Sequence, residues 1–222
     1  MLSRVYPNCL VLAALLALSA LRAAEVPPAA EALAQLSTTQ TTFTEYKDPY
    51  AHSSWTVVEI DFSGKAPGTQ KWINNVAVSL SIAWGTKGPP PQLDLSMAAT
   101  VNLVGVESGK HNTVFFFIPP EILARGPHGV TYEAGKTPSF YVVQYSVGGS
   151  ALTPTKADYS SQNLPDASYV KGFLNAAAGK AEKGGLLTEA TVAPYVLNSA
   201  LAHLAGEPNV FPTYLQAVDA GH

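Results

Sequence analysis

Hydrophobic and polar residues alternate along several stretches of this chain, and the clearest alternation lies in residues 93–103. The odd positions are apolar and the even positions are polar or small: Leu93, Leu95, Met97, Ala99, Val101 and Leu103 alternate with Asp94, Ser96, Ala98, Thr100 and Asn102. A period of two predicts a β-strand with one buried and one solvent-facing side. A turn-forming cluster at 107–112 and an apolar run at 114–118 follow. These features predict two antiparallel strands of a β-sandwich, joined by a turn.

Similar alternation recurs at 55–62 and 76–84, and residues 140–147 are rich in aromatic and β-branched side chains. Turn residues separate these segments, and no helical crossover lies between them. Near Gly105 the apolar positions shift from odd to even, which predicts a bulge where the strand can cross between sheets. The spacing predicts a mainly β fold, namely an antiparallel immunoglobulin-like β-sandwich with one or two accessory helices in the C-terminal third.

The chain divides into four segments by composition. Residues 1–23 contain Arg4 and an apolar run at 9–20, which predict a signal peptide. That run of about a dozen residues is shorter than the roughly 20 needed to cross a bilayer, so no transmembrane segment is expected after cleavage. Residues 24–42 are expected to be a lead-in with a short helix at 29–36, and residues 43–151 form the predicted sandwich. Residues 152–222 are expected to pack on it through a helix whose apolar stripe runs from Tyr169 to Ala181.

Charge and composition exclude several classes of protein. With 47% hydrophobic and 13% charged residues, the 222-residue chain is too apolar to be disordered. A formal net charge of −3 provides no basic surface for nucleic acid. The sole cysteine, Cys9, lies in the predicted signal peptide, so no disulfide, thiolate ligand or cysteine nucleophile is expected in the exported protein. The predicted location is the periplasm, the outer envelope or the cell surface.

Three patterns in the sequence could indicate a metal-binding, catalytic or phosphate-binding site. Five scattered histidines lack metal-ligand spacing, so no metal or cofactor is expected: His52, His111, His128, His203 and His222. Glu59 and Asp61 lie on one face of a predicted strand, where they are either paired carboxylates or ordinary solvent-facing charges. Residues 105–110 contain a Gly-Lys pair but do not match a phosphate-binding loop. No catalytic residue is predicted, and the chain is expected not to be an enzyme.

Aromatic residues leave a second function open. Several of them would suit a sugar-stacking platform if they were exposed and coplanar, and a core if they were buried: Trp55, Trp72, Trp84, Tyr141 and Tyr145. A carbohydrate-binding β-sandwich module is therefore the alternative function.

Residues 140–147 are the candidate site for a protein contact. The segment follows Pro138, ends at two glycines and is apolar on both sides. It is either a central strand covered on both faces or an edge strand able to pair with a strand of a partner protein. In the second case the partner-binding residues are Phe140, Tyr141, Val142, Val143 and Tyr145.

A family resemblance rests on an ordered set of strand and turn residues spanning about 41–195. The set comprises Trp55, the segment 59–62, Trp84, the segment 101–106, Gly109, the segment 115–121 and the segment 185–187. In this order the chain resembles the small pilus-like proteins encoded with the type IV pilus-like machinery of Verrucomicrobia. The resemblance implies a non-enzymatic structural or accessory component that contacts proteins of a pilus-like envelope complex. A removable signal differs from the retained N-terminal helix of ordinary type IV pilins, which favours an accessory role over a place in a pilus shaft.

Overall fold

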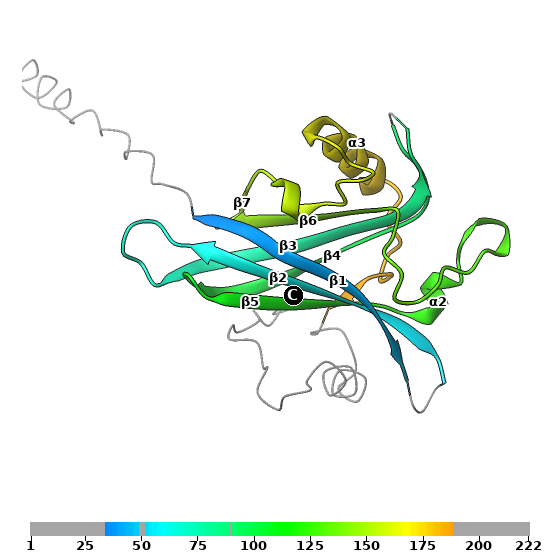
Figure 1. Ribbon diagram of the computed structural model, residues 1–222, viewed down its shortest axis with the longest axis horizontal. Helices are drawn as coiled ribbons and strands as arrows, with labels where there is room; N and C mark the ends of the chain where they lie inside the picture. Colours follow the sequence, from blue (N-terminus) through cyan, green and yellow to red (C-terminus); the bar gives the residue numbers. More distant parts are fainter. Residues whose placement is uncertain (1–33, 49–51, 89, 189–222) are drawn as a thin grey trace, which may run out of the picture. The chain divides into compact units, whose positions relative to one another are not determined.

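Two four-stranded antiparallel sheets make up the computed structural model over the residues that it describes, 34–48, 52–88 and 90–188 (Figure 1). One sheet has the order β1-β2-β5-β8 and the other the order β4-β3-β6-β7. The predicted mainly β, antiparallel sandwich is confirmed. The strands are β1 (Gln35–Lys47), β2 (Ser54–Lys65), β3 (Trp72–Thr86), β4 (Gln92–Glu107), β5 (His111–Ile118), β6 (Phe140–Val147), β7 (Ser150–Ala151) and β8 (Leu187–Thr188).

The strand order matches an immunoglobulin-like domain. If the first seven strands are lettered A, B, C, C′, E, F and G along the chain, one sheet is A-B-E and the other is C′-C-F-G. The short β8 adds to the first sheet beside β5, where it pairs through Phe116 and Phe117. No cysteine pair is needed for this arrangement, because apolar side chains from both sheets fill the space between them.

One part of the sequence prediction is wrong: the segments around 93–106 and 114–118 do not form a hairpin. β4 pairs with β3, whereas β5 pairs with β2 and β8, so the turn after Glu107 carries the chain from one sheet to the other. Alternation shows which side of a strand is buried but not which strand lies beside it. The expected bulge at Gly105 is also absent from the β3–β4 register, which shifts between Trp84 and Gly85. Near Gly105 the irregular residue is Asn75 of β3, which has a positive φ of 54°.

Inward-facing side chains of both sheets form the main core. Phe62 and Ile60 of β2 and Phe116 of β5 face Leu80 of β3 and Leu103 of β4, and each of these side chains is at most 1% exposed. Burying a side chain of this size contributes about 1.5 to 3 kcal/mol relative to leaving it in water. The sandwich is therefore stabilised by facing layers from two sheets.

The predicted C-terminal helix is present as α3 (Ala167–Ala178), which lies against the outer side of the β4-β3-β6-β7 sheet (Figure 1). Its apolar stripe packs there through Val170, Phe173 and Ala177, and the Phe173 ring stacks on Phe140 at 5.7 Å. The helix ends before Gly179, so the predicted stripe, which runs to Ala181, extends beyond it. A shorter helix, α2 (Pro120–Leu123), follows β5.

Asp166 caps the start of α3, which leads to a stability prediction. Its carboxylate accepts hydrogen bonds from the backbone N–H groups of Ser168 and Tyr169 at 2.8 and 3.1 Å. Asp166→Ala should lower the free energy of unfolding by about 1 kcal/mol, because these N–H groups lose their acceptor. Ser168→Ala, which leaves the capping carboxylate in place, should change it by no more than about 0.5 kcal/mol in the same urea titration. Equal effects of the two substitutions would contradict the capping role.

β1 starts earlier than expected, because the polar tract assigned to the lead-in is part of the strand. Residues 35–42 pair with β2, and the buried hydroxyl of Thr38 is hydrogen-bonded to the hydroxyl of Tyr145 at 2.8 Å. Threonine is β-branched and suits a strand once its hydroxyl has a partner. The predicted signal peptide, the helix expected at 29–36 and the segment after 188 lie wholly or mainly outside the described residues. None of the helices in the described ranges is long and apolar enough to cross a membrane.

A buried carboxylate links the two sheets along one side of the sandwich. Asp158, which is 1% exposed, lies in a 3-10 turn (Lys156–Asp158) and accepts a hydrogen bond from the backbone N–H of Thr38 at 3.0 Å. It also accepts from the N–H and hydroxyl of Thr155. The polar tract of β1 is thus held against the connection that follows β7.

Candidate functional site

The residues expected to form an open partner edge lie in β6, which is not an open edge strand. β6 lies between β3 and β7, with Phe140 and Val142 beneath α3 and with Val143 and Tyr145 in the main core. Tyr141 is half-buried. Both faces are apolar because both are covered, which is the pattern of an interior strand.

The outer side of β6 is largely occupied within the chain itself. Tyr141 exchanges two hydrogen bonds with Ser160: its N–H donates to the Ser160 hydroxyl at 3.2 Å, and its carbonyl accepts from the Ser160 N–H at 3.1 Å. The carbonyl of Tyr145 accepts from the N–H of Leu152 at 2.8 Å, and β7 pairs with the end of the strand. A partner strand would have to displace these contacts.

β4 is the terminal strand of its sheet and presents an open edge over part of its length. The carbonyl of Ser96 points away from β3 and accepts a hydrogen bond from the N–H of Glu182 at 2.8 Å. Since backbone direction alternates in an antiparallel strand, every second residue after Ser96 turns its N–H and C=O groups to the same side. No hydrogen-bond partner is found for those groups within the described ranges. We call these four residues the β4 edge: Ala98, Thr100, Asn102 and Val104.

Side chains along the β4 edge are exposed and uncharged. All four lie on the outer face of the sheet, and the hydroxyl of Thr100 is hydrogen-bonded to that of Ser79 at 2.8 Å. Val104 is 51% exposed, and on the neighbouring strand Trp72 is 46% exposed. Trp72 lies over Gly105, where an added Cβ would come within 3.4 Å of the indole ring. Two large apolar side chains are therefore exposed close to the end of the β4 edge.

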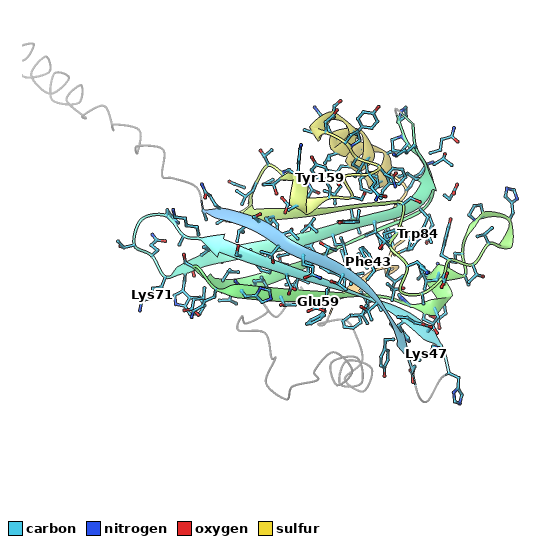
Figure 2. All side chains as sticks on the ribbon, in the orientation of Figure 1. Phe43, Lys47, Glu59, Lys71, Trp84 and Tyr159 are labelled. Atoms are coloured by element: carbon cyan, nitrogen blue, oxygen red, sulfur yellow. The ribbon has the colours of Figure 1, made fainter. Side chains whose placement is uncertain are left out.

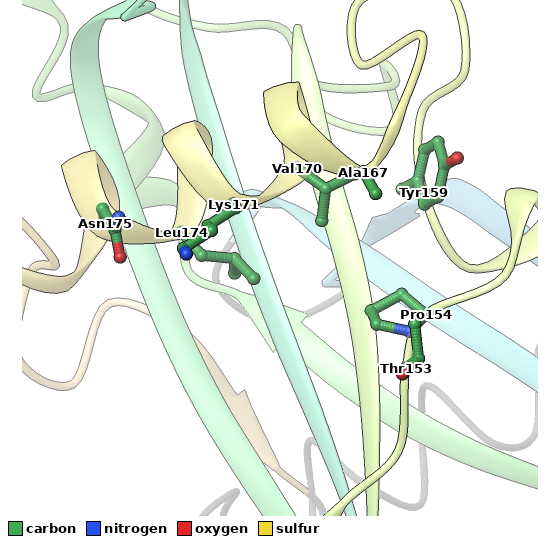
Figure 3. Close-up of a pocket in the computed structure, with 8 residues that line it drawn as sticks. All are labelled: Thr153, Pro154, Tyr159, Ala167, Val170, Lys171, Leu174 and Asn175. Carbon is green, nitrogen blue, oxygen red and sulfur yellow. The ribbon is translucent and has the colours of Figure 1, made fainter.

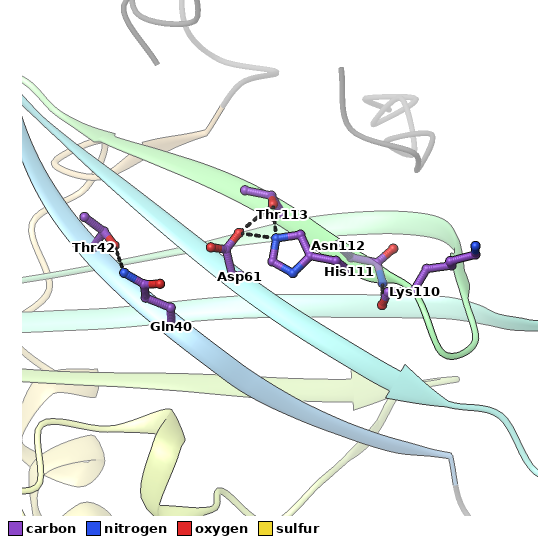
Figure 4. A network of polar contacts seen from close by, with 7 residues as sticks. All are labelled: Gln40, Thr42, Asp61, Lys110, His111, Asn112 and Thr113. Atoms are coloured by element: carbon purple, nitrogen blue, oxygen red, sulfur yellow. Dashed lines mark hydrogen bonds and ion pairs between the residues drawn. The ribbon is translucent and has the colours of Figure 1, made fainter. Parts of the chain in front are cut away.

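A second candidate lies on the outer face of the β1-β2-β5-β8 sheet, where Glu59 and Asp61 share one face as predicted. Figure 4 shows the polar contacts of Asp61. The Asp61 carboxylate accepts a hydrogen bond from the Thr113 hydroxyl at 2.6 Å and lies 3.0 Å from Nε2 of His111. His111 is 64% exposed, so this pair contributes little to stability. The geometry is that of a cross-strand polar network on an open sheet face.

The environment of Glu59 leads to a pH prediction. Burial raises the pKa of Glu59 above its ordinary value of 4.5; the nearby Asp61 raises it further, and His111 acts in the opposite direction. A carboxyl group whose pKa is raised in the folded state stabilises the fold below the unfolded-state pKa. It loses this contribution as pH rises through the folded-state pKa.

Glu59→Gln should therefore make the protein more stable than the wild type near neutral pH, because it removes an unfavourable charge. The difference should disappear as the pH falls below about 4, where Glu59 is protonated in both states. Urea unfolding midpoints measured across this range provide the test. Asp61→Ala is the control and should lower stability at neutral pH, since Thr113 loses its acceptor. A Glu59→Gln protein that is less stable than the wild type at neutral pH would contradict the prediction.

Two pockets lie beside the segment that follows β7, the first against α3 and the second against residues 137–141. The first has a volume of about 240 Å³ and is lined mainly by apolar groups, among them Pro154, Val170 and Leu174, with Lys171 at its side (Figure 3). The second, of about 340 Å³, is lined by hydroxyl and amide groups that include Ser160 and Asn163. Tyr159 borders both. Both volumes are at or below the lower end of the range for small-molecule sites.

The aromatic residues considered as a sugar platform lie in different places. Trp84, labelled in Figure 2, is 7% exposed and stacks on Tyr132 at 4.7 Å. Tyr145 packs on Phe62 in the core. Tyr141 packs on Phe43, and Trp55 is partly buried beside β5. Of the five, Trp72 alone is strongly exposed. The structure therefore does not bring these residues together as one flat surface.

The histidines are likewise separated. His111 is part of the polar network, while His52 lies in a loop and His128 in a short 3-10 helix (Pro127–Gly129), with positive φ values of 52° and 58°. His203 and His222 lie outside the described ranges. Among the described residues, no group of three or more His, Cys, Asp or Glu side chains is arranged to hold a metal ion.

Comparison with known proteins gives little further information. No protein-family model matches the sequence, and no curated protein matches it. A crystal structure from Akkermansia muciniphila is similar over 54% of this chain and 67% of that chain, with 18% sequence identity and a TM-score of 0.41. A likeness of this size assigns neither a family nor a function to the chain.

Proposed function

We propose that the protein is an exported, non-enzymatic accessory component of a type IV pilus-like cell-envelope complex and that it acts through protein–protein contacts. The observation that carries the proposal is the β4 edge, whose outward backbone groups have no partner among the described residues and whose side chains are exposed and uncharged. Such an edge readily accepts another strand, and soluble proteins usually protect it with charge, proline or a covering segment. An unprotected edge is therefore a favourable place for a partner protein to bind.

The sequence supports the cellular location of the protein and the source of its partner. The resemblance to small pilus-like proteins supports a pilus-like complex as the source of the partner, and the predicted signal peptide supports export to the periplasm or the cell surface. The polar network at Asp61 is consistent with a structural role, because the carboxylate is already occupied by Thr113 and His111.

The contact surface has the chemistry of strand addition. A strand that pairs with β4 would satisfy the outward N–H and C=O groups of alternate residues, and its side chains would lie beside Val104 and Thr100. Backbone hydrogen bonds provide affinity in such contacts, and neighbouring side chains provide selectivity. Trp72, which lies over the adjacent Gly105 and is 46% exposed, extends the apolar part of this surface.

Affinity capture from envelope extracts of the native host tests the proposal. The immobilised protein should retain proteins of a pilus-like assembly, and Thr100→Lys should abolish the retention because it places a charge on the β4 edge. Gln144→Lys is the matched control: Gln144 lies in the same row of the same sheet, opposite Ser79, but on the interior strand β6. Retention of polysaccharide instead of protein, or a hydrolase activity of the purified protein, would contradict the proposal.

A further inference from the structure

We infer that two copies of this chain pair with each other through their β4 edges, in antiparallel orientation, so that their β4-β3-β6-β7 sheets become one continuous sheet. The inference rests on the proposed function in one respect, because it names a partner for the same contact surface. It is carried by the open backbone groups of the β4 edge and by the self-complementary side chains along it.

The register follows from the alternation of backbone groups. Residues 98, 100, 102 and 104 face outward, and in an antiparallel ladder outward-facing residues lie directly opposite one another. A two-fold axis at Val101 satisfies this condition: Thr100 lies opposite Asn102 of the partner subunit, and Ala98 lies opposite Val104 of the partner subunit. The axis runs perpendicular to the sheet, so both outer faces point to the same side.

The ladder has natural limits at both ends. Before Ala98, the carbonyl of Ser96 is already bonded to the N–H of Glu182, so a second strand cannot pair there. After Val104 comes Gly105, with Trp72 lying over it, and then the turn to β5. The segment available for pairing is thus the β4 edge itself.

The side chains fit a second copy. Each pair joins a small residue to a larger one, or a hydroxyl to an amide, since Ala98 meets Val104 and Thr100 meets Asn102. Between Asp94 and Glu107, β4 carries no charged residue. Like charges that lie opposite each other disfavour cross-strand pairing, and two copies of this segment place none there. Pairing also covers part of Val104, which is 51% exposed in the single chain.

Some outward backbone groups of β1 and β6 are already bonded within the chain. On β1 the N–H of Thr38 is bonded to the buried carboxylate of Asp158, and on β6 the outer groups of Tyr141 are bonded to Ser160. β4 contains no lysine or proline to discourage strand addition. The register shift opposite β4 lies before the β4 edge, and the positive-φ residue Asn75 lies opposite the end of the β4 edge. The exposed edge is hence suited to pairing over its central part.

Sedimentation equilibrium and hydrogen exchange of the purified protein test this inference. The protein should form a dimer in a concentration-dependent manner, and amide exchange over residues 98–104 should slow by about tenfold or more at dimer-forming concentration. Thr100→Lys should raise the dimer dissociation constant by at least about tenfold, because each copy then places a lysine opposite Asn102 of the partner subunit. Gln144→Lys should dimerise like the wild type.

A monomer at all concentrations, or a dimer that leaves exchange over residues 98–104 unchanged, would overturn the inference. The exchange measurement uses the unaltered protein, so it remains decisive even if Thr100→Lys folds poorly. Failure here is distinguishable from failure of the proposed function: a monomer that still captures envelope proteins, and loses them in Thr100→Lys, refutes self-pairing and leaves the envelope partner in place.

Discussion

Replacing Phe116 with alanine should lower the free energy of unfolding by about 3 to 5 kcal/mol, the largest effect expected for a single side chain in this protein. Phe116 is fully buried in the main core, where it projects from β5 toward the opposite sheet. Removal of its ring deletes apolar contacts and leaves a cavity that a two-sheet core cannot fill by simple collapse. Urea unfolding followed by fluorescence measures the change.

Two companion substitutions test whether the two strands face each other across the core. Leu103→Ala should cost about 2 to 5 kcal/mol, because Leu103 is 1% exposed on the inner side of β4. Asn102→Ala, at the exposed neighbouring position, should change stability by no more than about 0.5 kcal/mol in dilute solution. Comparable losses at all three positions would contradict the register of β4 and the inward direction of Phe116.

Asp158→Ala should cost about 2 to 4 kcal/mol, because it leaves two backbone N–H groups, those of Thr38 and Thr155, without their acceptor. One of these groups belongs to β1 and the other lies in the connection after β7, so the substitution also loosens the contact between the sheets along this side. Chemical denaturation measures the loss of stability. Hydrogen exchange over residues 35–42 should accelerate at the same time.

Thr155→Ala is the matched control for Asp158. It removes only the hydroxyl that donates to the carboxylate and should cost about 1 kcal/mol. If Asp158→Ala cost no more than Thr155→Ala, the carboxylate could not be the acceptor that links β1 to the connection after β7.

The fold class could be predicted from the sequence because alternation with a period of two reports directly which side of a strand is buried. Leu103 is one of the odd apolar positions of 93–103, and it is buried. Alternation does not indicate which strand lies beside another. The sequence therefore predicts β4 and β5 as neighbouring strands joined by a turn, whereas they lie in different sheets. The sequence does not predict the polar start of β1, because the partners of its buried residue Thr38 are distant in sequence. Tyr145 and Asp158, which bond to Thr38, lie more than 100 residues after it.

The candidate site also depends on contacts between residues that are distant in sequence. Apolar residues on both sides of 140–147 are compatible with an open edge or with a covered strand, and the positions of β3, β7 and α3 decide between them. β4 was recognised as a strand, but its open edge depends on which segments lie beside it in space. The alternation predicts that the even positions of β4 are exposed and uncharged. It does not predict that β4 lies at the edge of its sheet.

Site-specific cross-linking in living cells tests the contact surface most directly. A photoreactive residue at Val104, on the β4 edge, should cross-link to protein, either a second copy of the chain or another envelope component. The same residue at Val130 is the matched control, since Val130 is 50% exposed and Val104 is 51% exposed, but Val130 lies in a loop away from β4. The account predicts protein adducts at position 104 and few at position 130. Equal labelling at the two positions, or no protein adduct at position 104, would contradict it.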